Sequence, residues 1–171
     1  PAAARAICEE LRARNHQAWV VGGCVRDHLL DRPVADWDVC TTALPKELLR
    51  AFPRAIPTGI EHGTVTVVRD GAHYEVTTLR GEGAYTDGRR PDKVYFLDDI
   101  TADLARRDFT VNAIAYDPLR ERALRDGGVR ARANLFEELE GALEVGLRAG
   151  DVAVVEVGLP QRAAGLGEDD A

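Results

Sequence analysis

Two β-branched runs separated by a tight-turn signal constrain the fold of this chain most strongly. Residues 64–68 (TVTVV) and 73–79 (HYEVTTL) flank the tripeptide Arg69-Asp70-Gly71. An Asp-Gly pair between two such runs is typical of a β-hairpin turn. Hairpin strands are antiparallel, whereas a doubly wound parallel sheet joins its strands through crossover helices. The sequence therefore predicts an α+β fold rather than a parallel α/β fold.

Further elements follow from apolar spacing and from residues that start or stop helices. We expect a helix over about 3–14 with Ile7 and Leu11 on one face, and a short buried strand over 18–21. The other expected elements are helices over 25–30, from Pro45, over 100–105, over 109–115 (capped by Asp108) and over 135–147, strands over 37–41 and 94–97, a mobile loop over 81–92 and a disordered acidic tail over 158–171. Together they predict a mixed, mainly antiparallel sheet flanked by helices.

Length and composition set broad limits. The 171 residues fit one domain with an appendage, and no apolar run approaches the ~20 residues of a membrane span. Cys8, Cys24 and Cys40 are widely spaced without a CxxC pair, so we expect neither a disulfide framework nor a structural zinc site. A reduced, cytoplasmic compartment without a secretory leader is the resulting expectation.

The net charge of −7 argues at first against a nucleic-acid partner, but its distribution matters more. Residues 127–171 hold nine acidic and four basic side chains, which leaves a net charge of only −2 for the first 126 residues. Twenty of the 22 basic residues are arginines, which suit bidentate phosphate contacts. A GC-rich genome would give the same bias, so composition alone leaves the partner open.

Asp36-Trp37-Asp38 is the most informative tripeptide for chemistry. In a strand, both carboxylates would project from one face, roughly 6–7 Å apart, and Trp37 from the other. Such a pair could hold Mg²⁺, which prefers oxygen ligands and keeps room for waters and phosphates. Two solvated acids on an exposed strand give the same pattern, so the tripeptide alone is a weak signal.

Gly22-Gly23, just upstream, predicts a second part of the same site. Glycines let backbone N–H groups approach a phosphate, and the start of the following helix adds a positive dipole. Arg26 on that helix could hold a phosphate bidentately. The pattern is neither a dinucleotide-binding fingerprint nor a P-loop. Together with Asp36 and Asp38 it describes a triphosphate cradle beside a metal-binding pair.

Two longer strings carry a resemblance to a known family. Residues 21–27 (VGGCVRD), followed by 36–38 (DWD) and Thr41, resemble the signature of class II tRNA nucleotidyltransferases, which are the CCA-adding enzymes and their bacterial poly(A) polymerase relatives. Residues 106–115 (RRDFTVNAIA) resemble the second motif of that family. The resemblance covers about residues 18–118. It implies a polymerase-β-like nucleotidyltransferase head, which we assign to residues 1–126.

The resemblance also implies roles for single residues. Asp36 and Asp38 would be the catalytic pair, holding two magnesium ions that activate an RNA 3′-hydroxyl and clamp the nucleotide phosphates. The incoming triphosphate would meet Gly22, Gly23 and Arg26. The second motif would bind the nucleotide and recognise its ribose, and its matching residues here are Arg107, Asp108 and Asn112.

Glu75 is the candidate for a third carboxylate, which this polymerase superfamily often has. The hairpin strand that carries it could run beside the strand of Asp38, about 4.8 Å away. A strand glutamate is more often solvated than catalytic, so both interpretations stay open. His62 has no second histidine at ligand spacing and is expected to be a turn residue. Cys40 would share the face of the aspartates as small packing.

Within the family, residues 58–66 (TGIEHGTVT) and 85–92 (YTDGRRPD) resemble the CCA-adding branch. We therefore expect a magnesium-dependent head that transfers CMP or AMP from CTP or ATP to the 3′ end of tRNA. A poly(A) polymerase head is one alternative. Residues 127–171 contain no EDxxR string, the neck motif that selects C or A in the family, so this segment is expected to be divergent or truncated. A nucleotide-binding module without tRNA-adding activity is the other alternative, and CC-only or A-only addition and the oligomeric state stay open.

Overall fold

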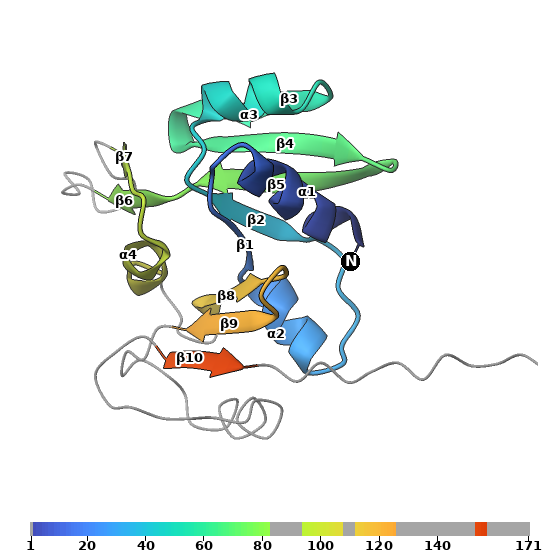
Figure 1. Ribbon diagram of the computed structural model, residues 1–171, viewed down its shortest axis with the longest axis vertical. Coiled ribbons are helices and arrows are strands. Elements are labelled where there is room, and N and C mark those ends of the chain that lie inside the picture. Colours follow the sequence, from blue (N-terminus) through green and yellow to red (C-terminus); the bar gives the residue numbers. More distant parts are fainter. Residues whose placement is uncertain (1, 83–93, 108–111, 126–152, 157–171) are drawn as a thin grey trace, which may run out of the picture.

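The computed structural model describes residues 2–82, 94–107, 112–125 and 153–156 (Figure 1). In chain order its elements are α1 (Ala2–Ala13), β1 (Ala18–Val21), α2 (Gly23–Leu29), β2 (Asp38–Thr41), α3 (Pro45–Ala51), β3 (Ala55–Gly59), the 3₁₀ helix η1 (Ile60–His62), β4 (Thr64–Arg69), β5 (Ala72–Thr78), β6 (Arg80–Glu82), β7 (Val94–Phe96), α4 (Ile100–Ala105), β8 (Ile114–Asp117), β9 (Arg122–Arg125) and β10 (Ala153–Glu156). None of the helices in these ranges is long and apolar enough to cross a membrane.

An eight-stranded sheet forms the centre, in the order β10-β9-β8-β1-β2-β5-β4-β3, and β6 pairs with β7 in a separate two-stranded sheet. Strands β2 and β5 are parallel, whereas every other neighbouring pair is antiparallel. The predicted α+β fold with a mixed, mainly antiparallel sheet is confirmed.

The expected hairpin joins β4 to β5. Arg69 pairs with Ala72, so the turn consists of Asp70 and Gly71, whose φ angles are 52° and 77°. Positive φ at both central residues is the geometry that the right-handed twist of a hairpin favours, and Asp-Gly tolerates it. The hairpin brings the full length of β5 against β4 and leaves its other edge to β2.

Alternating side chains of the strands separate two hydrophobic clusters on opposite faces of the sheet. On one face, Val20 and Val39 pack with α1, α2 and α3, and the predicted inner face of α1 is fully buried at Ile7 and Leu11. On the other face, the cluster is formed by β-strand side chains and by α4: Trp19, Val21, Cys40, Leu79, Ile100, Leu104, Ala113 and Ala115. The second face, which α4 covers only in part, is the one that matters for the candidate site.

Local chemistry explains where two helices end or begin. After α1, His16 N donates to Leu11 O at 3.0 Å and Asn15 has a φ of 66°, as in a Schellman motif. Before α4, the side chain of Asp99 accepts a hydrogen bond from Thr101 N at 2.9 Å. Such capping satisfies backbone groups that the helix itself leaves unpaired.

One predicted element is wrong, and another begins one residue later than expected. The segment expected to be a helix over 109–115 forms strand β8 from Ile114 onward, because it pairs with β1 on one side and with β9 on the other. Residues 108–111 lie outside the described part. The strand expected over 37–41 begins only at Asp38, so Asp36 and Trp37 precede it. The expectation that Asp36 and Asp38 project from one face of a strand, roughly 6–7 Å apart, therefore does not apply, because only Asp38 lies in the strand.

Other expectations fall partly or wholly outside the described residues. These are the loop over 81–92, except for its first two residues in β6, the helix over 135–147 and the tail over 158–171. Strand β10 lies beyond the boundary expected at residue 126, and it pairs with β9 at the edge of the sheet. Strands β3 and β9 were not expected, because Pro57 interrupts the first and the second is half arginine.

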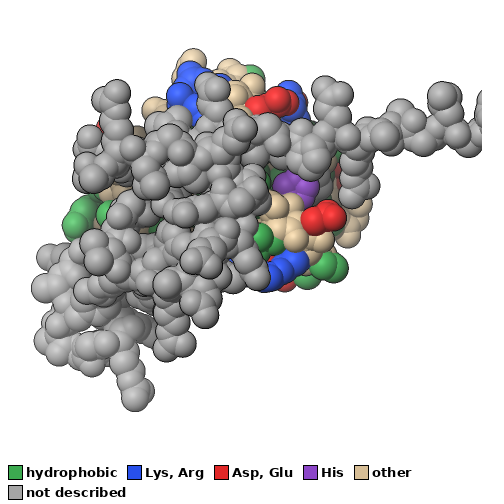
Figure 2. Space-filling model, turned by 90° about the horizontal axis from the view of Figure 1, so that it is seen from below, with side chains coloured by type: hydrophobic (Ala, Val, Ile, Leu, Met, Phe, Trp, Pro, Cys, Tyr) green, Lys and Arg blue, Asp and Glu red, His purple; other side chains and the backbone are tan. Residues whose placement is uncertain are grey.

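The surface of the described part mixes its side-chain types. The described side chains that are visible in Figure 2 include basic, acidic, histidine and hydrophobic groups.

Candidate active site

A row of paired residues across neighbouring strands places the carboxylates. Val21 at the end of β1 pairs with Asp38 at the start of β2, and Asp38 pairs with Glu75 of β5. Paired residues on adjacent strands project to the same face. Val21 belongs to the cluster on the α4 face, so Asp38 and Glu75 also project to that face. The parallel β2–β5 pair thus brings Glu75 beside Asp38.

Like charges gather around Asp38. Desolvation by the surrounding protein raises the pKa of Asp38, Glu75 and Asp36 raise it further, and only Arg107 acts in the opposite direction. Asp36 therefore lies close enough to act on Asp38, although it precedes the strand and is exposed. The charges of Glu75 and Asp36 disfavour the ionised form of Asp38, an effect that a bound cation would offset.

Gly22 opens the site from the side of β1. Its φ of 84° and ψ of −150° are accessible to glycine alone, and its N–H donates to Ile114 O at 2.9 Å. A Cβ at this position would lie 3.7 Å from Nη1 of Arg107 and 4.0 Å from Oδ2 of Asp38. The glycine turn therefore faces both the carboxylate and the arginine of the second motif.

The first and second motifs also meet at Arg26. Its guanidinium pairs with the carboxylate of Asp27 through Nε at 2.8 Å and Nη2 at 2.7 Å, and Nη1 donates to Oδ1 of Asn112. The side-chain hydrogen bond of Arg26 lowers the pKa of Asp27 and the pair raises the pKa of Arg26. A Cβ on Gly23 would come within 3.3 Å of Nη2 of Arg26. Gly23 thus leaves room for the arginine itself.

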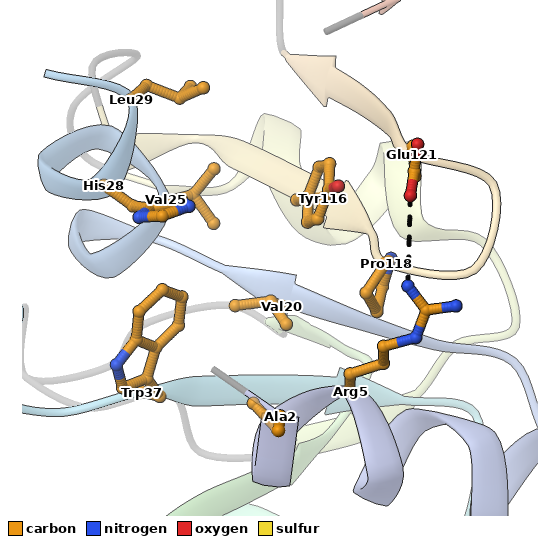
Figure 3. Close-up of a pocket in the computed structure, with 11 residues that line it drawn as sticks. Ala2, Arg5, Val20, Val25, His28, Leu29, Trp37, Tyr116, Pro118 and Glu121 are labelled. Carbon is orange, nitrogen blue, oxygen red and sulfur yellow. Dashed lines mark ion pairs between the residues drawn. The ribbon is translucent and has the colours of Figure 1, made fainter. Parts of the chain in front are cut away.

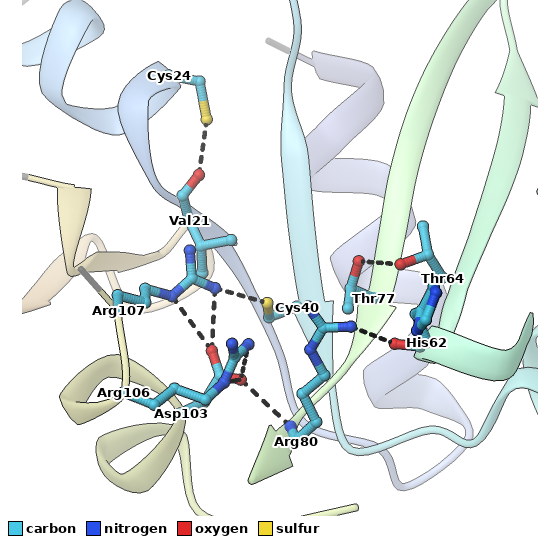
Figure 4. A network of polar contacts seen from close by, with 10 residues as sticks. All are labelled: Val21, Cys24, Cys40, His62, Thr64, Thr77, Arg80, Asp103, Arg106 and Arg107. Carbon is cyan, nitrogen blue, oxygen red and sulfur yellow. Dashed lines mark hydrogen bonds and ion pairs between the residues drawn. The ribbon is translucent and has the colours of Figure 1, made fainter. Parts of the chain in front are cut away.

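Arg107 is held by a residue that sequence reasoning missed, Asp103 of α4 (Figure 4). The Asp103 side chain is fully buried; one oxygen accepts from Arg107 Nη2 at 2.9 Å and the other from Arg106 Nη2 at 2.8 Å. It also accepts from Arg80 N at 3.2 Å. Arg107 Nη2 further donates to Sγ of Cys40 at 3.3 Å. The spacing of one aspartate three and four residues before two arginines was the available signal.

The pKa shifts in this network follow from burial and pairing. Burial alone would raise the pKa of Asp103, but the charges of Arg107 and Arg106 outweigh it and lower the pKa. Burial raises the pKa of the Cys40 thiol to about 12, so Cys40 acts as small packing and a hydrogen-bond acceptor. The network fixes the guanidinium of Arg107 under the glycine turn.

An apolar cavity of about 190 Å³ lies behind the site, between α1, α2 and β8 (Figure 3). Trp37 lines it, half-buried, and meets the ring of His28 edge-on with 5.5 Å between ring centroids. Arg5 and Glu121, also in the lining, form an ion pair at 3.9 Å. Trp37 therefore packs on the face opposite to Asp38, as predicted.

The structure brings together most of the predicted site residues. Asp36, Asp38, Glu75, Gly22, Gly23, Arg26, Arg107 and Asn112 lie in one region, and Asp108 lies outside the described residues. Within the described ranges, no three His, Cys, Asp or Glu side chains already converge as a metal-binding group. His62 is exposed at the end of η1 and lies apart from this group as a turn residue.

A mixed sheet with paired carboxylates beside a glycine turn has the architecture of a nucleotidyltransferase head. Residues 18–131 match the family described as "Poly A polymerase head domain", and the chain belongs to that family. It is 54% identical over 112 residues to a CCA-adding enzyme of Bacillus cytotoxicus, covering 66% of this chain and 28% of the relative. It is 50% identical over 138 residues to a CCA-adding enzyme of Anoxybacillus flavithermus, covering 81% of this chain and 35% of the relative.

Solved structures agree with these relatives. The crystal structure of the Bacillus stearothermophilus CCA-adding enzyme in complex with CTP has a TM-score of 0.60 and 45% identity, covering 67% of this chain and 27% of that chain. A CCA-adding enzyme in complex with ATP has a TM-score of 0.51 and 26% identity, covering 69% of this chain and 27% of that chain. The present chain thus spans about a third or less of the length of the proteins it matches.

Proposed function

We propose that this chain is the nucleotidyltransferase head of a CCA-adding enzyme and transfers CMP and AMP from CTP and ATP to the 3′-hydroxyl of tRNA. The observation that carries the proposal is the pairing of Asp38 with Glu75, with Asp36 close by, in front of Gly22 and Arg107. The solved relatives in complex with CTP and with ATP support the two nucleotides. Three buried free cysteines are consistent with a reduced, cytoplasmic setting.

The donor set fits magnesium. Asp36, Asp38 and Glu75 offer carboxylate oxygens, the ligands that Mg²⁺ prefers, and Mg²⁺ usually keeps positions for waters and substrate phosphates. Desolvation and the charges of Glu75 and Asp36 together raise the pKa of Asp38, and a divalent cation would offset both effects. Because no three of these groups converge beforehand within the described residues, phosphates or waters would complete the coordination. When bound, magnesium supplies charge stabilisation and lowers the pKa of the attacking hydroxyl.

The side chains of the candidate site have separate proposed roles in binding the RNA end and the nucleotide. Asp38 and Asp36 orient the 3′-hydroxyl side of the reaction, with Glu75 as the third carboxylate. Arg107, fixed by Asp103, offers its guanidinium to the phosphates at the point where Gly22 leaves the turn open. Arg26 of α2 would join the phosphate contact by exchanging its bonds to Asp27 and Asn112 for the phosphate. By resemblance to the family, the second motif with Asn112 and Asp108 would recognise the ribose.

Magnesium-dependent nucleotide binding tests the proposal. CTP should stabilise the full chain against thermal unfolding only when magnesium is present, by about 2.7 kcal/mol at a hundredfold excess over Kd. The Asp38→Asn variant should lose this gain, whereas Asp98→Asn, at an exposed position, should keep it. A CTP response that is unchanged in Asp38→Asn would contradict the carboxylate assignment.

A poly(A) polymerase head is the second candidate, because the matching family is described by that activity. Extension of a tRNA that lacks its terminal CCA distinguishes the two. Incorporation of both CMP and AMP, from CTP and ATP respectively, would favour the head of a CCA-adding enzyme. Long products with ATP alone would favour poly(A) synthesis.

A further inference from the structure

A second cavity, of about 520 Å³, opens at the opposite end of β1 from the candidate active site. The residues used below are Arg12 of α1, Trp19 of β1, and Asp117, Arg120 and Arg122 around the β8–β9 turn. Trp19 belongs to the same face of the sheet as Val21, whose partner is Asp38. The cavity and the carboxylates therefore open toward the same side of the sheet.

Positive charge exceeds negative charge in the cavity wall. Among the described residues that line it, three carry guanidinium groups and Asp117 is the one carboxylate. Asp117 is already saturated: Oδ2 accepts from Arg12 Nη2 at 2.7 Å, and Oδ1 accepts from the backbone N–H groups of Leu119 and Arg120. One carboxylate cannot neutralise three guanidinium groups, so the wall keeps a net positive charge.

Two of these arginines have a buried Nε donor without an acceptor, although Arg12 Nη2 is bonded to Asp117 and to Ala18 O. The Nε atoms of Arg12 and Arg122 are buried and have no hydrogen-bond partner. No ion pair or hydrogen bond links the Arg122 side chain to any of the residues that the structure describes. A buried donor without an acceptor is costly, and an anion with several oxygens would remove that cost at both arginines. The cavity therefore has the charge and the unused donors of an anion site.

We propose that this cavity binds a backbone phosphate of the RNA strand whose 3′ end lies at Asp38. Phosphate offers several charged acceptors to planar guanidinium groups, which bind it more strongly than neutral acceptors. Trp19 of β1 and Gly22, which directly follows β1, stand three residues apart, roughly 10 Å, so one RNA strand can reach both places. The RNA source rests on the proposed function; the phosphate chemistry rests on the cavity alone.

Binding of a short fluorescein-labelled single-stranded RNA to the full chain, followed by fluorescence anisotropy, tests the proposal. Arg122→Gln removes a charge that forms no ion pair with the described residues. Arg120→Gln removes a side chain that is 65% exposed and whose Nε lies 3.9 Å from Oδ2 of Asp117, and both variants keep the 2.7 Å pair between Arg12 and Asp117. Each should raise the RNA Kd by about tenfold and lower the slope of log K against log salt by about 0.7. Arg50→Gln, at an exposed position on α3, removes the same charge elsewhere and should have a much smaller effect.

Equal RNA affinity in the wild type, Arg122→Gln and Arg120→Gln would overturn the proposal, as would equal weakening by Arg50→Gln. Pyrophosphate alone separates the two phosphate sources. If it stabilises the wild type but not Arg122→Gln while RNA affinity stays unchanged, the RNA assignment is overturned. Magnesium-dependent stabilisation of the wild type by CTP is measured in parallel. Its absence would overturn the proposed function, whereas the comparison of Arg122→Gln with Arg50→Gln still measures the cavity.

Discussion

At the scale of single residues, we expect substitution of Asp103 to lower the free energy of unfolding more than any other substitution considered below. Its fully buried carboxylate neutralises Arg106 and Arg107 at once. Removing one partner of a buried ion pair leaves uncompensated charge, so Asp103→Asn should lower the free energy of unfolding by about 3 kcal/mol. Urea denaturation measures this loss, with Asp98→Asn as the exposed control. A loss no larger than that of the control would contradict the role given to the network.

Acid pH should reproduce part of this loss. The pKa of Asp103 is lowered in the fold, so its stabilisation is complete above the ordinary value of 3.8 and disappears as pH falls through the lower folded pKa. The wild type should therefore lose stability below about pH 4 more steeply than Asp103→Asn. Parallel acid titrations of the two proteins, followed by circular dichroism, measure the difference. Identical slopes would argue that Asp103 is not ionised in the fold.

Asp38 should behave in the opposite way. Its pKa is raised, so the folded protein binds this proton more tightly than the unfolded chain does, and ionisation costs stability as pH rises through the folded pKa. Asp38→Asn should therefore raise the melting temperature at neutral pH when magnesium is absent. In the wild type, stabilisation by magnesium with CTP should fade on acidification at a pH above 3.8, because protons compete for the carboxylate. A lower melting temperature of Asp38→Asn without magnesium would contradict the repulsion inferred here.

At the scale of secondary-structure elements, short-range residue patterns correctly predicted those elements whose formation depends on neighbouring residues in the chain. The strand of residues 18–21, the helix of 100–105 and the Asp70-Gly71 hairpin all match the structure. The failures lie where distant pairing decides: β8 forms because β1 and β9 flank it, and β9 forms beside β8 despite its arginines. In the site, the hairpin made Glu75 a candidate, but only the parallel pairing of β5 with β2 sets it opposite Asp38. Asp103 was missed because spacing on a helix does not reveal burial.

The turn between β1 and α2 gives a prediction at this scale. Gly22 has backbone angles that side chains rarely adopt, so Gly22→Ala should cost about 1–3 kcal/mol and displace the turn from Arg107. CTP and ATP affinity should fall together, because the turn faces the shared phosphates. Gly71→Asn is the matched control, since its positive φ suits asparagine and no atom lies within 4 Å of the added Cβ. Thermal unfolding and calorimetric titration measure both effects, and a loss of affinity for one nucleotide only would argue for base recognition at this turn.

At the scale of the whole molecule, the groups around Asp38 predict nucleotide transfer that does not discriminate between CTP and ATP. Choosing C over A requires donors and acceptors against the edge of the base, because CTP and ATP share their phosphates and ribose. The described side chains that gather here are carboxylates and guanidinium groups beside a glycine turn, which address metal and phosphate, together with the amide of Asn112, whose Oδ1 accepts from Arg26. Residues 127–171 contain no EDxxR string, and with nine acidic against four basic side chains they repel RNA phosphates.

The chain by itself should therefore bind CTP and ATP with similar affinity and add nucleotides to tRNA slowly and without fixed order. Calorimetric titration of both nucleotides in magnesium measures the first expectation. Primer extension on a tRNA that lacks its terminal CCA measures the second, with Asp38→Asn as the inactive control. Efficient, ordered addition of C, C and A by these 171 residues would show that base selection lies within the head. In that case the side chains that read the base would have to lie among residues other than the carboxylates and arginines described above.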